Sequence, residues 1–264
     1  MQSLSSDHWP ALRTSLDPER CCSLHAPHVI TTGHGAIWVD RWPSPRAVAA
    51  FTGGNLGLTG DPTAISPEAF AAVVAGLLIE WERVFIDPGP DFESMVRRGS
   101  ADLRLWPRVL YSLAGEPSTP RRVANGVVRP IEPDDEAAVS SLDTSINWIS
   151  DTHDGAANLA ASGRAVGAFA DGRLRAVAAV FYAGNRFEEL GVVTDPAFRG
   201  AGLSTACAAL LIDQIRSRGR MACWSTTPDN LASIRVAEKL GFAFVGAQRH
   251  LMAGDPMNGT LPLD

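Results

Sequence analysis

The chain has 264 residues, which is long for one average domain and sufficient for two. Hydrophobic residues make up 45% of it and charged residues 20%, a balance that excludes an intrinsically disordered protein. The formal net charge is -6 and no basic run occurs, which argues against a nucleic-acid-binding surface. Residues 1–20 lack the apolar core of a secretion signal, and no apolar run is long enough to cross a bilayer. We therefore expect a cytoplasmic protein with neither a nucleic-acid nor a membrane partner.

The cysteines do not have the spacing of a disulfide framework or of a metal site. Cys21 and Cys22 are adjacent and badly placed to bridge each other, Cys207 and Cys223 stand alone, and no Cys-x-x-Cys occurs. The histidines show no metal-ligand spacing either. We expect free thiols in a reducing compartment and no bound metal.

The N-terminal part of the chain predicts a mixture of helices and strands. Ser66, Pro67 and Glu68 are a cap, a first-turn proline and an acidic residue, which together mark the start of a helix. Glycine-rich stretches at 53–55 and 60–62 indicate loops. In chain order, the expected elements are a short helix over 7–16, a hairpin of strands 28–32 and 36–39, a helix from 66 to 78, a strand at 84–86, a helix over 91–98 and a strand at 103–113.

A break follows at residues 115–120, where proline, glycine and small polar residues separate two patterned regions. We expect an N-terminal α+β domain over residues 1–116, whose role the sequence does not indicate. A linker over 117–124 and a second domain over 125–264 would follow. No sequence repeat relates the two halves.

The second half predicts regularly alternating elements. The Asp171-Gly172 pair is a strong two-residue turn signal between two strands. In chain order, the expected elements are a strand at 127–131, a helix beginning at 134–136, a helix at 155–162, a hairpin of strands 165–170 and 175–182, a strand at 188–194, a helix from 203, a short strand before 230, a helix over 231–240 and a strand at 244–251.

The most informative stretch joins the strand ending at Thr194 to the next helix. It contains Arg199, Gly200, Ala201, Gly202, Leu203 and Ser204. The two glycines let the main chain turn sharply and let another molecule approach it. The unpaired amides of the first helical turn, at the positive end of the helix dipole, suit a phosphate or a pyrophosphate.

Other ligand-binding loops do not match this stretch. No Gly-Lys-Ser/Thr follows, so it is not a Walker loop. The third glycine and the downstream acidic residue of a dinucleotide fingerprint are missing. A strand-to-helix turn without a ligand is the remaining alternative for this short motif taken alone.

A second segment favours the ligand-binding interpretation. Asn230 is a good N-cap, the apolar spacing of Ile234, Ala237 and Leu240 is helical, and Gly241 marks the end of the helix. The two segments together are harder to obtain by chance than either alone.

These segments resemble the GNAT superfamily of acetyl-CoA-dependent N-acetyltransferases. The family's acyl-CoA loop follows the pattern Arg/Gln-x-x-Gly-x-Gly/Ala, which Arg199, Gly202 and Ser204 match, with serine in the last position. Its second cofactor-contacting helix carries an asparagine, a small residue three positions on and a terminal Gly-Phe. Asn230, Ser233 and the pair Gly241-Phe242 match that signature. The chain is similar to two-part GNAT proteins that carry an N-terminal α+β region.

The resemblance implies the fold and the cofactor site. The second half would form a mixed, mostly antiparallel sheet flanked by helices, so that the whole chain is of the α+β class. The amides of the loop would bind the pyrophosphate of acetyl-CoA, and the strand edge before it would pair with pantetheine. The implied cofactor-binding residues are Val192, Val193, Thr194, Arg199, Gly200, Ala201, Gly202, Leu203, Ser204, Asn230 and Ser233.

The candidate base is a glutamate at the start of the same strand. Glu188 and Glu189 are neighbours, and the alternation of a strand sends them to opposite faces. GNAT enzymes commonly place a glutamate here, acting directly or through a water. We favour Glu189, whose face also carries Gly191, with Glu188 as the second choice. The alternative is that either residue is a solvated carboxylate at a strand end.

The candidate acid departs from the family pattern. Many members have a tyrosine in the last helix that protonates the departing thiolate, and Ala237 occupies that position here. The two tyrosines, Tyr111 and Tyr182, lie elsewhere. Water, Ser225 or Ser233 would then supply the proton.

The sequence therefore predicts an N-acetyltransferase that moves an acetyl group from acetyl-CoA to a primary amine by direct attack in a ternary complex. The acceptor would be a small molecule or a peptide amine, and the sequence does not indicate the oligomeric state. The alternative is a non-catalytic module that binds acyl-CoA and acts as a sensor. A transferase for another acyl chain is a further possibility.

Overall fold

The computed structural model describes residues 1–14, 18–100, 102–113, 115, 126–257 and 260–262. It divides into two compact units: unit 1 consists of residues 1–108 and 247–264, and unit 2 of residues 109–246. This division differs from the expected one because the end of the chain belongs with unit 1. The expected linker over 117–124 lies outside the described residues.

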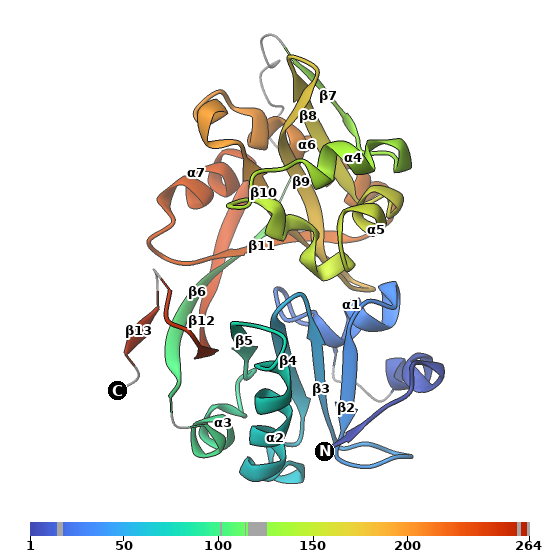
Figure 1. The fold of residues 1–264 in the computed structure, drawn as a ribbon, viewed down its shortest axis with the longest axis vertical. Coiled ribbons are helices and arrows are strands. Elements are labelled where there is room, and N and C mark those ends of the chain that lie inside the picture. Colours follow the sequence, from blue (N-terminus) through green and yellow to red (C-terminus); the bar gives the residue numbers. More distant parts are fainter. Residues whose placement is uncertain (15–17, 101, 114, 116–125, 258–259, 263–264) are drawn as a thin grey trace. The chain divides into compact units, whose positions relative to one another are not determined.

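Unit 2 contains a mixed sheet with helices on both faces (Figure 1). Its strands stand in the order β7-β8-β9-β10-β11-β6, with β10 and β11 parallel and the other neighbours antiparallel. The elements are β7 (Val127–Pro130), η3 (Pro133–Asp135), α4 (Glu136–Ser140), η4 (Asn147–His153), α5 (Ala156–Ala161), β8 (Ala165–Ala170), β9 (Arg173–Ala183), β10 (Phe187–Thr194), η5 (Pro196–Phe198), α6 (Leu203–Ser217), β11 (Met221–Thr226), α7 (Leu231–Lys239) and the first part of β12 (Phe242–Gly254). This order confirms the expected sequence of strands and helices.

Two apolar layers hold the helices of unit 2 to its sheet. On one face, Cys207 and Ile212 of α6 pack against Leu190 of β10. On the other face, Ile149 of η4 packs with Val193 of β10 and with the side chains of α4 and α5. Successive residues of β10 therefore face different helices, which decides the surroundings of each functional side chain.

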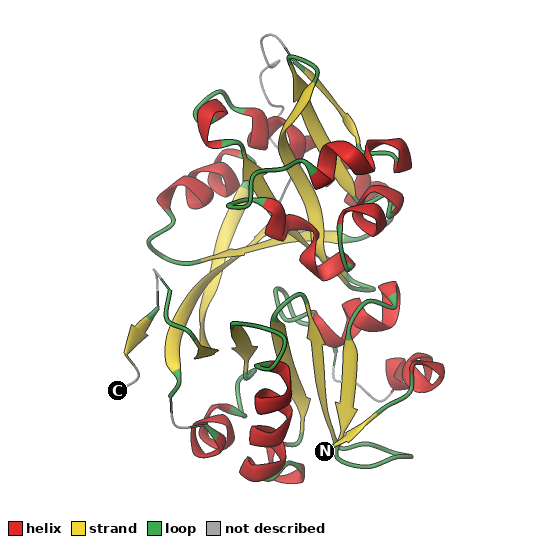
Figure 2. Ribbon diagram, viewed as in Figure 1, coloured by secondary structure: helices red, strands yellow, loops and turns green. Residues whose placement is uncertain are grey.

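Unit 1 is also an α+β unit, so the expected class is confirmed for both parts of the chain. Its strands stand in the order β1-β2-β3-β4-β5-β12, with β4 and β5 parallel, and helices lie on both sides of the strands (Figure 2). The elements are β1 (Gln2–Ser3), η1 (Ser6–Thr14), α1 (His25–Thr32), β2 (Ala36–Val39), β3 (Ala47–Thr52), β4 (Asn55–Gly60), η2 (Pro62–Ala64), α2 (Pro67–Leu77), β5 (Arg83–Asp87), α3 (Glu93–Gly99), β6 (Arg104–Leu113), the end of β12, and β13 (Leu261–Pro262), which pairs with β6.

Two features of unit 1 differ from expectation. Residues 28–32 were expected to form a strand and instead form the second half of α1. Their β-branched side chains favour a strand locally, but His25, Ala26, His28 and Val29 are buried at helical spacing, and packing on β3 overrides the local preference. The expected loop at 53–55 extends into a hairpin of β3 and β4, which the sequence did not predict.

Unit 1 repeats the topology of unit 2, although no sequence repeat is visible. From β1 to β6 the chain forms a strand, two helical segments, three antiparallel strands, a helix, a strand, a helix and a strand. From β7 to β12 it forms the same series. The parallel pair β4 and β5 corresponds to the parallel pair β10 and β11.

The turns after β4 and β10 fix the correspondence residue by residue. The amide of Asp61 donates to the carbonyl of Arg46 at 2.9 Å, and the amide of Asp195 donates to the carbonyl of Arg175 at 2.8 Å. Each aspartate forms an ion pair with the same arginine and caps a short 3-10 helix. Counting back along the strands from these aspartates, Gly57 corresponds to Gly191.

None of the helices that the structure describes has the length and hydropathy needed to cross a bilayer.

Candidate active site in unit 2

The sheet of unit 2 opens between its two parallel strands. β10 pairs with β11 over Phe187, Glu188 and Glu189. Beyond this pairing, β11 remains paired with β6 as far as Thr226, whereas β10 continues beside β9 to Thr194. Along the described part of β10, residues 190–194 therefore have no ladder partner on the side of β11. This open edge contains the predicted cofactor residues Val192, Val193 and Thr194.

The loop after β10 leads directly to the start of α6. Gly200 and Gly202 have φ angles of 81° and 79°, which favour glycine. A Cβ atom added at either position would meet no atom within 4 Å, so open space lies beside the main chain. Arg199, Gly200, Ala201 and Gly202 are exposed. Among the described residues, Arg199 has no ion-pair partner.

The start of α6 is an uncapped helix N-terminus. Gly202 is the N-cap and has no side chain to accept from the first turn. The amide of Ala206 donates to the carbonyl of Gly202 at 3.1 Å, so the amides of Leu203 and Ser204 precede the first helical hydrogen bond. The side chain of Leu203 is buried and anchors the turn. Such amides, together with the positive end of the helix dipole, suit an anion.

Arg175 and Asp195 hold this loop in place. The guanidinium of Arg175 contacts the Asp195 carboxylate at 2.8 Å, and its centre lies 4.2 Å from the centroid of the Phe198 ring. The side chain of Asp195 also accepts from the amide of Ala197 at 3.0 Å. The turn is therefore fixed before any ligand arrives.

Asn230 and Ser233 lie at the start of α7, where they have structural partners. The side chain of Asn230 accepts from the amide of Ser233 at 3.1 Å and so caps the helix. The Ser233 hydroxyl accepts from the indole nitrogen of the buried Trp224 at 2.9 Å. Asn230 is exposed and Ser233 is half-buried, so both can still meet a ligand.

Glu188 and Glu189 are both buried, and they have different surroundings. The Oε2 atom of Glu188 lies 2.5 Å from a guanidinium nitrogen of Arg218, and Arg164 approaches its other oxygen at 3.9 Å. Neither glutamate is a solvated strand-end carboxylate, since their exposed fractions are 2% and 4%. Glu188 is held in an ion pair beyond the end of α6.

Glu189 faces the other side of the sheet, together with Gly191. The hydroxyl of Ser225 donates to its Oε1 atom at 2.5 Å. Across the strand pair, Glu189 stands opposite Tyr182, and a β-bulge follows between Glu189 and Leu190. Such bulges redirect side chains and are frequent beside active sites. A Cβ atom on Gly191 would come within 2.8 Å of Ile149, so this glycine allows the close approach of η4.

Two polar groups on η4 were not among the predicted site residues. His153 is buried, and its Nε2 atom lies 2.8 Å from the carbonyl of Val180 at the bulge. Asp151 is partly buried, and this burial raises the pKa of its carboxyl to about 6. The sequence carries no local signal for either, because the burial depends on how η4 packs on β9.

Two further side chains limit the chemistry of the site. Burial raises the pKa of the Cys207 thiol to about 12, so it is protonated at neutral pH and unsuited to act as a nucleophile. Ala237, in the place where the family commonly has tyrosine, is fully buried in α7.

Comparisons with known proteins point to one family. A family model described as GNAT acetyltransferase matches residues 123–249. A curated relative from Streptomyces virginiae, named an uncharacterized N-acetyltransferase in the mutA 5' region, is 35% identical over 195 residues. The match covers 72% of this chain and 78% of that protein.

Solved structures share the fold. A GCN5-related N-acetyltransferase-like protein from Streptococcus suis has a TM-score of 0.62 at 18% identity, covering 84% of this chain and 89% of that one. A tandem GNAT protein from the clavulanic acid biosynthesis pathway has a TM-score of 0.57 at 15% identity, covering 97% of this chain and 98% of that one. Taken with the curated relative and the family model, these findings identify the protein: the chain belongs to the GNAT acetyltransferase family.

Proposed function

We propose that unit 2 transfers an acetyl group from acetyl-CoA to a primary amine by direct attack in a ternary complex. The observation that carries this proposal is the separation of β10 from β11 just beyond Glu189, beside the uncapped start of α6. A buried carboxylate, an open strand edge and an anion site thus lie along one strand and the loop that follows it.

The donor would lie along β10 and the loop. The amides of Leu203 and Ser204 and the exposed glycine turn would receive the pyrophosphate, with Arg199 available as a cation. The pantetheine amides would pair with the unpartnered edge of residues 190–194, as an added strand does. Because the protein uses main-chain groups for both tasks, the site demands little of the side chains there.

Glu189 would be the base. An amine arrives as an ammonium ion and must lose a proton before its lone pair attacks the thioester carbonyl. Glu189 takes that proton directly or through a water, the C–N bond forms, and the C–S bond then breaks to release CoA thiolate. The hydrogen bond from Ser225 orients the carboxylate. We favour Glu189 over Glu188 because Arg218 pairs with Glu188.

Water would protonate the departing thiolate. Ala237 has no hydroxyl, and the hydroxyl proton of Ser225 is donated to Glu189. The hydroxyl of Ser233 already accepts from Trp224 and serves as a contact at the start of α7. A thiolate is a modest base, so its protonation by solvent is tolerable.

The acceptor would be a small molecule or a peptide amine, received on the η4 side of β10. Glu189 and Gly191 both face that side. Asp151 and Trp148 of η4 are partly exposed there and offer a carboxylate and an aromatic face to a cation.

The second candidate function is a non-catalytic acyl-CoA sensor. One observation favours it, namely the buried alanine at 237 in place of a tyrosine. The buried and oriented Glu189 favours catalysis, since a sensor has no use for a base at that position.

The experiment is thiol release from acetyl-CoA with a panel of primary amines and peptides, run with the wild type, Glu189→Gln and the control Glu136→Gln. Glu136 is an exposed carboxylate at the start of α4. We expect turnover to fall by about 100-fold in Glu189→Gln and to be unchanged in Glu136→Gln, because a positioned base contributes at least that much. Calorimetry with CoA should give the same affinity for all three proteins.

Two outcomes would contradict the proposal. Binding of CoA without thiol release for every amine would favour the sensor. Equal turnover by Glu189→Gln and the wild type would show that Glu189 is not the base. Repeating the assay with propionyl-CoA and succinyl-CoA tests whether acetyl is the preferred acyl group.

A further inference from the structure

Unit 1 has the topology of unit 2 but departs from it at each feature of the donor site. β4 and β5 stay paired through Gly57, the counterpart of Gly191, whereas in unit 2 the pairing stops at Glu189. Asn55 stands at the position that corresponds to Glu189, and its amide group donates to the carbonyl of Gly53. The pairing of unit 1 therefore extends two residues further and leaves a shorter open edge at residues 58–60, and no acidic residue stands at the position of the base.

The anion site at the helix start is missing too. The side chain of Ser66 caps α2 by accepting from the amide of Ala69 at 3.1 Å. Pro67, the first helical residue, has no amide hydrogen. A pyrophosphate would find neither free amides nor a glycine turn here.

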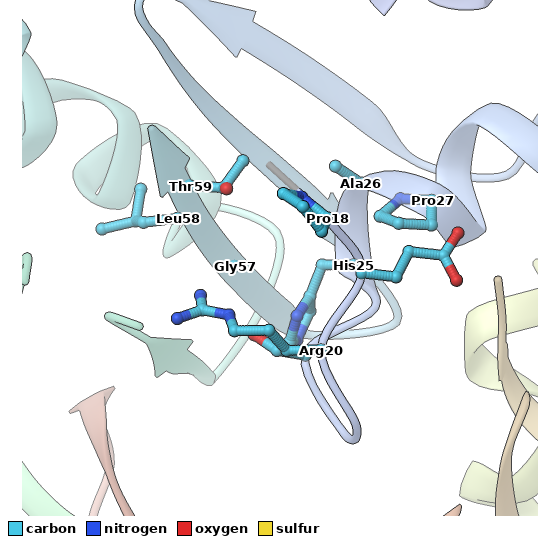
Figure 3. Close-up of a pocket in the computed structure, with 10 residues that line it drawn as sticks. Pro18, Arg20, His25, Ala26, Pro27, Gly57, Leu58 and Thr59 are labelled. Atoms are coloured by element: carbon cyan, nitrogen blue, oxygen red, sulfur yellow. The ribbon is translucent and has the colours of Figure 1, made fainter. Parts of the chain in front are cut away.

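Unit 1 nevertheless contains a hollow beside β4 (Figure 3). It is lined by Gly57, Leu58 and Thr59 of β4, by the first turn of α1, and by Arg20 and Ser23. A Cβ atom on Gly57 would come within 2.4 Å of the His25 ring, as one on Gly191 would meet Ile149. His25 of α1 therefore packs on Gly57 as Ile149 of η4 packs on Gly191, and the hollow lies beside this contact.

Two residues that line the hollow, Ser23 and His25, belong to a buried polar cluster around Asp87. The hydroxyl of Ser23 donates to Asp87 at 2.5 Å, and the imidazoles of His25 and His250 lie 3.9 and 3.6 Å from its carboxylate oxygens. Burial lowers the pKa of both imidazoles. Asp87 is 2% exposed, so its charge is compensated by hydrogen bonds and not by solvent.

The mouth of the hollow favours a single negative charge. The guanidinium of Arg20 has no ion-pair partner among the residues that the structure describes, and Arg20 is exposed. The N-cap of α1 is Leu24, which has no side-chain oxygen to cap the helix. Pro27 in the first turn has no amide hydrogen, so the positive end of the helix borders the hollow with the amides of His25 and Ala26. Glu19 also lines it and disfavours a doubly charged anion such as phosphate.

We propose that unit 1 binds a small monocarboxylate in this hollow, with the carboxylate on Arg20 and the start of α1 and the apolar part over Gly57 and Leu58. Unit 1 is then a ligand-binding module that shares the topology of unit 2. The proposal is independent of the chemistry proposed for unit 2.

The test is a titration of the full chain with acetate and butyrate at constant ionic strength, followed by NMR of ¹³C-labelled histidine rings. The resonance assigned to His25 should shift and saturate. Arg20→Gln should weaken binding by about tenfold, because a charge-assisted contact is lost. The matched control is Arg41→Gln, an exposed arginine of unit 1 that lies outside the hollow, and it should bind as the wild type does.

Each arm of the experiment can overturn the proposal. If neither carboxylate gives a saturable shift, unit 1 does not bind a monocarboxylate in this hollow. If Arg20→Gln and the wild type bind with equal affinity, Arg20 does not contact the ligand carboxylate. Tighter binding of inorganic phosphate than of either carboxylate overturns the ligand class. Arg20 lies on the surface, so Arg20→Gln should fold, and its circular dichroism checks that it does.

Discussion

Two neighbouring glutamates on β10 have different surroundings because a strand sends them to opposite faces. Glu188 pairs with Arg218, whereas Glu189 is held by Ser225 on the η4 side. We expect Glu188→Gln to lower the free energy of unfolding by about 2 kcal/mol, because it leaves a partly buried guanidinium without its partner. Urea denaturation measures this change.

The contrast with Glu189→Gln completes this prediction. That variant should lose turnover and little stability, while Glu188→Gln should lose stability and keep its affinity for CoA. The assignment of roles would fail if both variants lost the same amount of stability and the same amount of turnover.

The polar cluster of unit 1 makes the stability of the protein depend on pH. Burial lowers the pKa of His250 to about 4, against an ordinary value of 6.5, with Asp87, His25 and Arg108 around it. The unfolded chain therefore binds a proton that the folded chain excludes between pH 6.5 and 4. Stability should fall as the pH falls through this range, by on the order of 3 kcal/mol for this group.

The lowered pKa values of His25 and Asp87 act in the same direction. For Asp87, burial opposes the shift, and the nearby imidazoles, the Ser23 hydroxyl and the Gly89 amide outweigh it. Urea denaturation at pH 7, 6 and 5 checks the slope for the wild type and for His250→Gln, in which it should be shallower. An unchanged slope in the variant would show that another group is responsible.

At the scale of elements, α6 offers a matched pair of glycines at its two ends. Gly202 and Gly219 have φ angles of 79° and 70°, and open space surrounds both. Alanine at either position should cost about 1 kcal/mol of stability, because its side chain disfavours a left-handed conformation.

The two variants should differ in their affinity for CoA. Gly202→Ala places a methyl group where the donor's phosphates would approach the amides, and calorimetry should show a loss of about tenfold. Gly219→Ala, at the far end of the same helix, should bind CoA as the wild type does. Equal affinities would exclude the start of α6 as the phosphate site.

The elements that the sequence predicted are those with local signals. The glycines at 200 and 202, the cap at Asn230 and the Ser66-Pro67 pair each lie within one turn of the helix that they mark. α1 was missed because its β-branched residues favour a strand until they pack on β3. The ion pair of Glu188 with Arg218 could not be predicted, since thirty positions separate the two residues and neither carries a motif.

For the whole molecule, the repeat predicts one CoA site and not two. The parallel strands of unit 1 stay paired two residues further than those of unit 2, and the start of α2 is capped. Calorimetry with CoA should therefore give one site per chain, and Gly202→Ala should weaken that single site. Two sites per chain would mean that unit 1 retains a donor site.

The repeat itself was invisible in the sequence because its two copies share geometry and few residues. The ion pairs of Asp61 with Arg46 and of Asp195 with Arg175 reveal it only once the strands are aligned. The polar cluster of unit 1 was also invisible in the sequence, since it unites residues 23, 25, 87 and 250 from distant parts of the chain.

The discontinuity of unit 1 has a consequence for the order in which the protein is built. β5 obtains its antiparallel neighbour from residues 251–254, which are translated long after β5 itself. Most of unit 1 leaves the ribosome first, but its sheet is complete only after nearly all of the remaining chain has been translated. A premature stop codon shortly before Leu251 would then destabilise unit 1 more than unit 2, because unit 1 would lose the strand that pairs with β5.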